Sequence, residues 1–121
     1  MKILVVDDYA VIRKIHINNF NKMGIMDIDE AENGNEAIEA ANRIRYDLIL
    51  LDWHMPSMNG LEVLKILRTQ GINAPIVFCT DESEKESIKS AMLGGATRYI
   101  TKPYTPTQFR SIMNELLGLR T

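Results

Sequence analysis

Short runs of apolar, mostly β-branched residues alternate along the chain with longer stretches in which apolar positions recur at helical spacing. The runs predict five strands: Ile3 to Val6, about Asp27 to Ala31, Leu48 to Leu51, Ile76 to Cys79 and about Tyr99 to Thr101. The first, third and fourth are apolar at nearly every position, which is typical of parallel strands covered by helices on both faces. The second alternates polar and apolar residues, as an edge strand does.

Start and stop signals predict a helix after each strand. Apolar residues at Ile12, Ile15, Phe20 and Met23 lie at helical offsets, and Gly24 marks the end of the first helix. The others are expected from Asn35 to Ile44, from Leu61 to Gln70, from a capping-box start at Ser83 and Glu86 to Gly94-Gly95, and from Thr105, Pro106 and Gln108 onward.

Five strands alternating with five helices predict an α/β domain with a parallel sheet and right-handed crossovers. For five such units we expect the flavodoxin-like strand order 2-1-3-4-5, in three layers, doubly wound, with a switch point between the first and third strands. Ligands bind at the carboxyl ends of the strands at such a point. We therefore expect one domain over residues 1–121 with its site at that edge.

Composition narrows the class of protein further. The chain has 121 residues, of which 45% are hydrophobic and 25% charged, with a formal net charge of −2. This balance argues against nucleic acid as a direct partner, and no run approaches the roughly 18 apolar residues of a membrane span. The single Cys79 forms no disulfide within the chain, and Met1 is not followed by a secretory leader. We expect a soluble, cytoplasmic protein without membrane insertion.

Polar residues follow the predicted strands where each one ends. Asp7 and Asp8 follow the first strand, Asp52 the third, Thr80 the fourth and Lys102 the fifth. Neighbouring strands lie about 4.8 Å apart, so three carboxylates should converge at the switch point. Like charges ~4 Å apart repel by roughly 4 kcal/mol at an effective dielectric near 20, so the cluster needs a cation or a shifted pKa. Oxygen ligands without imidazole or thiolate favour Mg²⁺, which commonly accompanies a phosphate.

The same residues suit phosphoryl transfer. The carboxylate of Asp52 can act as a nucleophile and form an acyl phosphate. A Mg²⁺ ion, the Lys102 ammonium and the Thr80 hydroxyl can offset charge on the phosphoryl oxygens. We expect positioning and charge to supply the catalysis.

On these residues the chain resembles the response-regulator receiver family, and within it the stand-alone chemotaxis regulators. The matching segments, in order and over essentially the whole chain, are Val5 to Asp8, Leu51 to Leu61, Thr80, Gly94 to Ala96, Tyr99 and Lys102-Pro103. The resemblance implies that Asp52 accepts the phosphoryl group. It also implies that Asp8 and Asp52 bind Mg²⁺ together with the backbone carbonyl of His54, and that Asp7 assists through water or as a further ligand.

The resemblance further implies a signalling switch that catalyses only its own phosphorylation and dephosphorylation. A histidine kinase would phosphorylate the chain, Lys102 would contact the phosphoryl group, and its bond to Pro103 would be cis. The new charge would draw Thr80 inward, and Tyr99 would rotate into the vacated space. The output surface would comprise roughly Glu84 to Leu93, Arg98 to Thr101 and Thr105 to Leu117. A downstream target such as a flagellar motor switch or another signalling protein, and a phosphatase, would be further partners.

Three residues near the predicted site depart from the family or vary within it. Asp81 follows Thr80 where the family usually has a small residue, so we expect slow phosphorylation by small donors. His54 and Glu82 stand two residues after the acceptor and the threonine, where receivers vary. We expect these two side chains to alter the rate of dephosphorylation.

Several other residues have simpler interpretations. A lone helical histidine such as His16 is usually on the surface or partly packed, and Cys79 fits a small buried strand residue. Met55 and Met58 lie in the loop after Asp52, where they are expected to line the site. Trp53 adjoins the acceptor and is a useful reporter of events there.

Four alternatives compete with a phosphorylated receiver. A phosphohydrolase of the haloacid-dehalogenase type would need Asp-x-Asp after the first strand and a specificity cap, and a flavodoxin-like FMN carrier would have its phosphate repelled by Asp7 and Asp8. The chain could also be a degenerate receiver used only for docking, against which the intact acceptor set argues. The fourth alternative is a receiver cut from a larger regulator or a phosphorelay intermediate. Gly118 to Thr121 fits either a natural terminus or the start of a linker in a larger regulator.

Overall fold

Five strands and five helices alternate along residues 1–119, the part of the chain that the computed structural model describes. The strands are β1 (Lys2–Val6), β2 (Asp27–Ala31), β3 (Leu48–Leu51), β4 (Ile76–Thr80) and β5 (Arg98–Thr101). The helices are α1 (Ala10–Asn21), α2 (Gly34–Arg43), α3 (Gly60–Thr69), α4 (Lys85–Leu93) and α5 (Pro106–Leu117). Arg120 and Thr121, the end of the terminal segment considered above, lie outside the described residues.

The strands form one parallel sheet in the order β2-β1-β3-β4-β5, as the sequence predicts. Every residue of β3 and β4 is buried, whereas β2, at the edge, buries only Ala31 fully. The register pairs Val6 of β1 with Ala31 on one side and with Leu51 on the other. The carboxyl ends of β1 and β3 are therefore level with each other, and the switch point lies between them.

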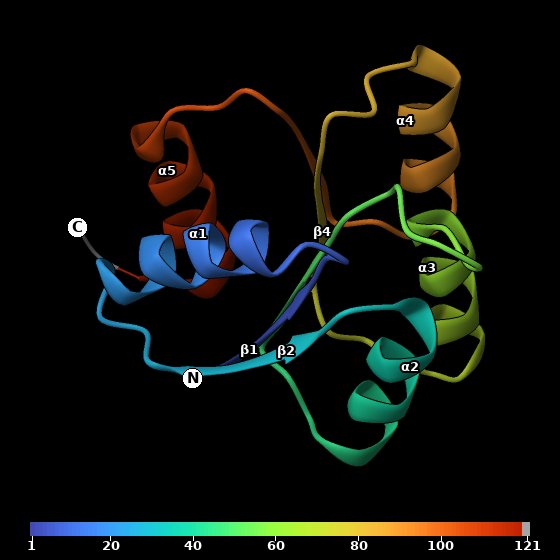
Figure 1. Ribbon diagram of the computed structural model, residues 1–121, viewed down its shortest axis with the longest axis horizontal. Coiled ribbons are helices and arrows are strands. Elements are labelled where there is room, and N and C mark those ends of the chain that lie inside the picture. Colours follow the sequence, from blue (N-terminus) through green and yellow to red (C-terminus); the bar gives the residue numbers. More distant parts are fainter. Residues whose placement is uncertain (120–121) are drawn as a thin grey trace.

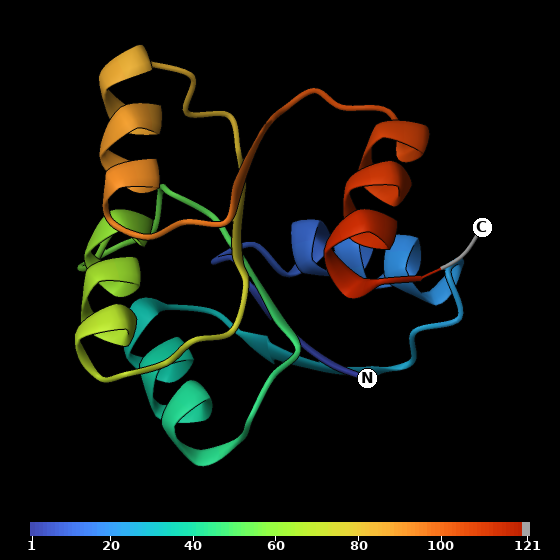
Figure 2. The same cartoon turned by 180° about the vertical axis from the view of Figure 1, so that it is seen from behind.

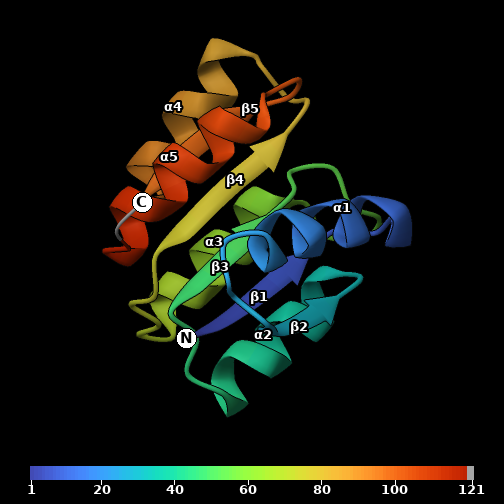
Figure 3. The same ribbon diagram turned by 90° about the vertical axis from the view of Figure 1, so that its left-hand side faces the viewer.

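Helices cover both faces of the sheet, so the core is divided in two (Figure 1). One half packs side chains of α2, α3 and α4 against alternate strand residues such as Leu4 and Val6. The other half packs α1 and α5 against Ile3 and Val5, which alternate with Leu4 and Val6 along β1 and face the opposite side of the sheet (Figures 2 and 3). No helix in the described part of the chain has the length and apolar character needed to cross a bilayer.

The predicted capping box of α5, formed by Thr105 and Gln108, is confirmed. A second capping box, which was not predicted, joins Asn59 and Glu62 at the start of α3. The capping box predicted at Ser83 is wrong, because α4 begins at Lys85 with Glu84 as its N-cap. The reason lies in the preceding turn, where the Glu82 carboxylate accepts the backbone N–H of Glu84 at 3.0 Å.

The prediction that His16 lies on the surface or is half-packed is wrong, since its side chain is only 2% exposed. It lies on the same face of α1 as Phe20, and that face packs against α5. Its ring stacks on Tyr104 and Phe109, with centroids 6.3 and 6.2 Å away. Burial, and then the positive charge of Lys102, lower the pKa of His16 to about 4. By contrast, Cys79 is buried as predicted, and burial raises the pKa of its thiol to about 12.

The substitution His16→Leu should make the free energy of unfolding decrease less steeply as the pH is lowered. The pKa of His16 falls from 6.5 to about 4 on folding, so the unfolded chain binds more protons between these values. As the pH falls from 6.5 to about 4, the free energy of unfolding of the parent should therefore decrease on the order of 2 to 3 kcal/mol more than that of the variant. Above pH 6.5 the neutral His16 imposes no such loss. Urea unfolding at a series of pH values measures the difference. Parallel curves for the two proteins would contradict the expectation.

Candidate functional site

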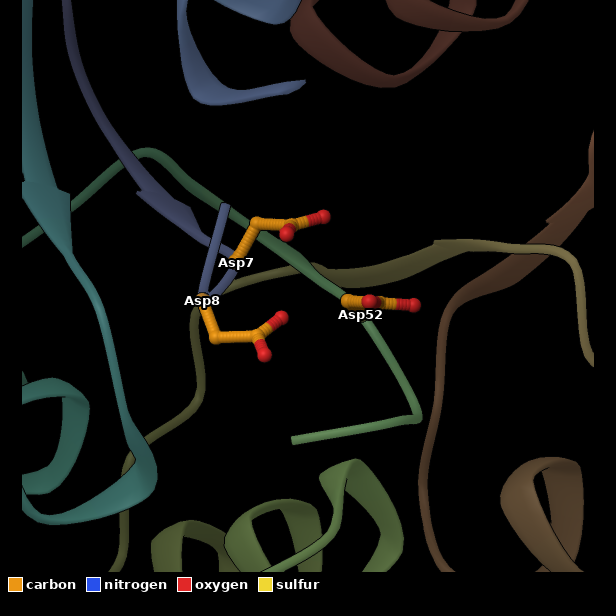
Figure 4. A group of neighbouring side chains, drawn as sticks. All are labelled: Asp7, Asp8 and Asp52. Atoms are coloured by element: carbon orange, nitrogen blue, oxygen red, sulfur yellow. The ribbon is translucent and has the colours of Figure 1, made fainter. Parts of the chain in front are cut away.

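Three carboxylates meet where β1 and β3 end. Asp7 and Asp8 follow β1 directly and Asp52 follows β3, and one oxygen of each lies within 4.8 Å of the others. Figure 4 shows the three side chains leaving the strand ends toward the same space. The sheet hydrogen bonds continue past the strands to hold them, since Asp7 N–H donates to Ala31 and Asp52 N–H to Val6, both at 3.1 Å. The structure therefore confirms that these three side chains converge.

Burial makes this cluster electrostatically unfavourable without a cation. Asp7 is 1% exposed and Asp52 8%. Burial raises the pKa of Asp7 from 3.8 to about 6, against the lowering effect of the Tyr9 backbone N–H at 2.9 Å, and the charge of Asp52 raises it further. The Lys102 ammonium lies 3.8 Å from Asp7 and offsets part of the negative charge.

The donor set fits a hard divalent cation. Oxygen Oδ1 of Asp8 is buried and has no hydrogen-bond partner among the described residues, so it has a lone pair to offer. Carboxylate oxygens are the ligands that Mg²⁺ prefers in proteins. A hollow of about 440 Å³ adjoins the cluster, lined by Asp8, Tyr9, Trp53, His54, Met55, Pro56 and Asn59. His54 and Met55 therefore border the site. The expectation that Met58 also lines it is wrong for this hollow, because Met58 packs beside Gly34 and against the core instead.

Thr80 and Lys102 come from the neighbouring strands on the same edge. Thr80 ends β4 and is fully buried, and its hydroxyl oxygen accepts the backbone N–H of Glu82 at 3.2 Å. The backbone N–H of Lys102 donates to the Thr80 carbonyl at 2.8 Å, which joins the ends of β4 and β5. The peptide bond between Lys102 and Pro103 is cis, as the family resemblance implies. The structure thus brings all five sequence-predicted polar residues to one rim.

A contact between side chains of two loops lies beside the site, and the sequence did not reveal it. Nε2 of His54 lies 3.1 Å from Oε1 of Glu82 and 4.0 Å from Oδ1 of Asp81. Asp81 is exposed beside this contact. His54 and Glu82 belong to loops that follow different strands, so only the sheet order brings them together.

Glu82 also connects the acceptor loop with the predicted switch residues. Its backbone N–H binds the Thr80 hydroxyl, and its carbonyl accepts the hydroxyl of Tyr99 at 2.7 Å. The Tyr99 ring stacks on Phe78 at a centroid distance of 5.4 Å. Burial, followed by the charges of Glu82 and Asp52, raises the pKa of Tyr99 to about 12. A displacement of residues 80–82 would therefore move the anchor of the Tyr99 hydroxyl.

Close packing behind Asp52 requires a glycine at position 60. A Cβ on Gly60 would lie 2.3 Å from the Asp52 carbonyl oxygen and 2.7 Å from the Phe78 ring. The Gly60 N–H donates to the Trp53 carbonyl at 2.8 Å, while the Trp53 N–H donates to Oδ1 of Asp52 at 2.8 Å. The loop between β3 and α3 thus folds tightly under Asp52, and Trp53 adjoins this carboxylate.

Comparison with known proteins identifies the family. The family model of the response regulator receiver domain matches residues 3–114. The chain belongs to the response-regulator receiver family. It is therefore a receiver of two-component signalling, which implies a histidine kinase as donor partner and a downstream target. This membership disfavours the phosphohydrolase and FMN-carrier alternatives.

Individual relatives agree with this assignment. A chemotaxis protein CheY homologue of Campylobacter jejuni is 36% identical, with 98% of this chain and 93% of that protein covered. The receiver domain of Francisella response regulator 1452 aligns with a TM-score of 0.88 at 34% identity, over 97% of this receiver and 96% of that chain. Chemotaxis protein CheY4 of Vibrio cholerae aligns with a TM-score of 0.87 at 31% identity, over 96% of this receiver and 98% of that chain.

The substitution Asp7→Asn should stabilise the receiver in the absence of Mg²⁺. Folding buries an ionised Asp7 beside two other carboxylates, a penalty fully present above a pH of about 6 and absent below 3.8. We expect the free energy of unfolding at pH 7 to rise by about 1 to 3 kcal/mol, and the gain to shrink as the pH falls from 6 toward 4.

Urea unfolding with and without Mg²⁺ checks this, and added Mg²⁺ should stabilise the parent more than the variant. The exposed Glu32→Gln is the matched control, expected to change stability by less than about 0.5 kcal/mol. A variant less stable than the parent in the absence of metal would contradict the expectation.

Proposed function

We propose that Asp52 accepts a phosphoryl group from the phosphohistidine of a histidine kinase in a Mg²⁺-dependent reaction, and that this modification switches the affinity of the receiver for a partner. The observation that carries the proposal is the convergence of three carboxylates within 4.8 Å at the ends of β1 and β3. Lys102, 3.8 Å from Asp7, supplies a positive charge beside them.

In the proposed reaction, a carboxylate oxygen of Asp52 attacks phosphorus and the phosphorus–nitrogen bond of the phosphohistidine breaks. The donor imidazole keeps the electron pair of that bond. Bound Mg²⁺, held by Asp8, Asp52 and the His54 carbonyl with help from Asp7, would offset the charge of the phosphoryl oxygens. The Lys102 ammonium and Thr80 hydroxyl would contact those oxygens, and the Trp53 N–H holds the acceptor carboxylate in place.

The proposed switch starts at Thr80. Its hydroxyl oxygen accepts the Glu82 N–H. A phosphoryl group on Asp52, carrying roughly −1.5 to −2 charges, would accept the hydroxyl hydrogen and draw the Thr80 side chain toward Asp52, away from the Glu82 N–H. Because Glu82 also holds the Tyr99 hydroxyl, a shift of this segment would change the position of Tyr99. Phosphorylation would then bias a two-state equilibrium through the difference in interactions between its states.

The proposed output surface is formed by α4, β5 and α5, next to Tyr99. The partner would be a flagellar motor switch or another signalling protein, and a phosphatase would reset the signal. Similarity to chemotaxis proteins of Campylobacter jejuni and Vibrio cholerae supports a role in chemotaxis. Action as one receiver domain over residues 1–121, in the cytoplasm, belongs to the same proposal.

The acceptor is tested by intact mass after incubation with Mg²⁺ and acetyl phosphate or phosphoramidate. The parent should gain one phosphoryl group, Asp52→Asn should gain none, and chelation of Mg²⁺ should abolish the reaction, because Asp52 supplies both the nucleophile and a metal ligand. Asp47→Asn is the matched control, since Asp47 accepts the Lys2 N–H at the other end of β3. A parent that gains no phosphoryl group from these donors or from a histidine kinase would contradict the proposal.

His54→Asn should shorten the lifetime of the phosphorylated protein. Nε2 of His54 lies 3.1 Å from the Glu82 carboxylate, and in the proposed function this contact shields the phosphorylated Asp52 from water. Contacts between partly exposed polar side chains contribute up to about 1 kcal/mol, so we expect dephosphorylation about two- to fivefold faster without it. Decay of the phosphorylated mass after removal of the donor measures the rate. Glu82→Gln should act like His54→Asn, and the exposed Glu86→Gln should not; equal rates in all four proteins would refute a role for the pair.

A further inference from the structure

A partly buried polar contact at the edge of the core joins α1 to the loop that carries Lys102. Nδ1 of His16 lies 3.1 Å from the hydroxyl of Tyr104, and Nδ2 of Asn19 lies 3.5 Å from the same hydroxyl. Asn19 donates to the Tyr104 oxygen, so the Tyr104 hydroxyl can donate its own proton to His16, and the Cys79 thiol is a further neighbour of this hydroxyl. Burial keeps His16 neutral, with its pKa lowered to about 4, so Nδ1 can accept that proton.

Ring stacking restricts the same two side chains further. The planes of His16 and Tyr104 are inclined by 16°, those of His16 and Phe109 by 10°, and those of Tyr104 and Phe109 by 26°. Three rings from α1, the loop and α5 thus form one near-parallel group. An apolar residue at position 16 could fill the space, but it could not orient the Tyr104 hydroxyl.

Tyr104 stands two residues after Lys102, and both sides of Lys102 are anchored. On one side the Lys102 N–H donates to the Thr80 carbonyl at 2.8 Å, and on the other Tyr104 is held by His16. The side chain between these anchors places its ammonium 3.8 Å from Asp7. Asp7 itself lies just before α1, the helix that carries His16. The His16–Tyr104 contact and the Lys102–Asp7 contact therefore both link the Lys102 loop to the segment that contains Asp7 and α1.

We propose that His16, acting through Tyr104, is a positioning residue for the Lys102 ammonium. The inference rests on the proposed function, in which that ammonium contacts the phosphoryl group. Catalysis by charge requires the group to be placed before the reaction, and small displacements of such groups reduce rates strongly.

The test compares His16→Leu, which fills the core without a hydrogen bond, with Tyr104→Phe, which keeps the ring and removes the hydroxyl. Each should slow phosphorylation by acetyl phosphate about three- to tenfold, and the double variant should be no slower than either single one. His16→Asn, whose amide oxygen can replace Nδ1 as acceptor, should restore part of the rate. Ile25→Val, in the same half of the core, controls for lost stability.

Two further measurements separate positioning from a structural role. In a Lys102→Ala background, His16→Leu should cause no further slowing, because the group it positions is absent. In the parent without Mg²⁺ or donor, the Lys102 ¹³Cε NMR resonance, assigned with Lys102→Arg, should shift on His16→Leu and on Tyr104→Phe but not on Ile25→Val.

Equal slowing by His16→Leu with and without Lys102, or an unmoved Lys102 resonance, would overturn the inference. Variants that lose thermal stability yet react at the parent rate would overturn it as well. Failure of the proposed function is distinguishable, because the parent would then take no phosphoryl group while the resonance would still report whether His16 positions Lys102.

Discussion

The repulsion among Asp7, Asp8 and Asp52 is the constraint on which the rest of the structure depends. Parallel pairing of β1 and β3, with Val6 opposite Leu51, places these carboxylates within 4.8 Å of one another. Folding must overcome this repulsion, and the central strands supply the opposing free energy because they are buried on both faces. The same repulsion favours a positive charge beside the cluster, and the Lys102 ammonium lies 3.8 Å from Asp7.

Glu82 connects the neighbourhood of the carboxylate cluster with β5. Its side chain contacts His54, its N–H binds Thr80 and its carbonyl binds Tyr99. Thr80 at the end of β4 and Tyr99 on β5 are thus both hydrogen-bonded to the backbone of one residue. The adjacent α4 begins at Lys85, with Glu84 as its N-cap, so its first turn follows this connection directly in the chain.

The two halves of the core differ in the chemistry they contain. The half under α2, α3 and α4 is built from apolar side chains together with Tyr46. The half under α1 and α5 includes the partly buried His16–Tyr104 contact beside Cys79 and Phe109. Such a contact favours one arrangement of the groups around it, because turning the buried His16 away would leave its ring nitrogen without a partner. In this protein the contact involves Tyr104, two residues after Lys102.

The sequence by itself determined the alternation of strands and helices, the strand order and the rim on which Asp7, Asp52, Thr80 and Lys102 meet. These features follow from local periodicity and from the rule that parallel strands end at one edge of the sheet. The burial of His16 and the His54–Glu82 contact came only from the three-dimensional packing, because a pattern along one segment contains no information about its partner across the fold. The close approach of Gly60 to Asp52 and the start of α4 follow from the geometry of local turns, which hydrophobic periodicity does not encode.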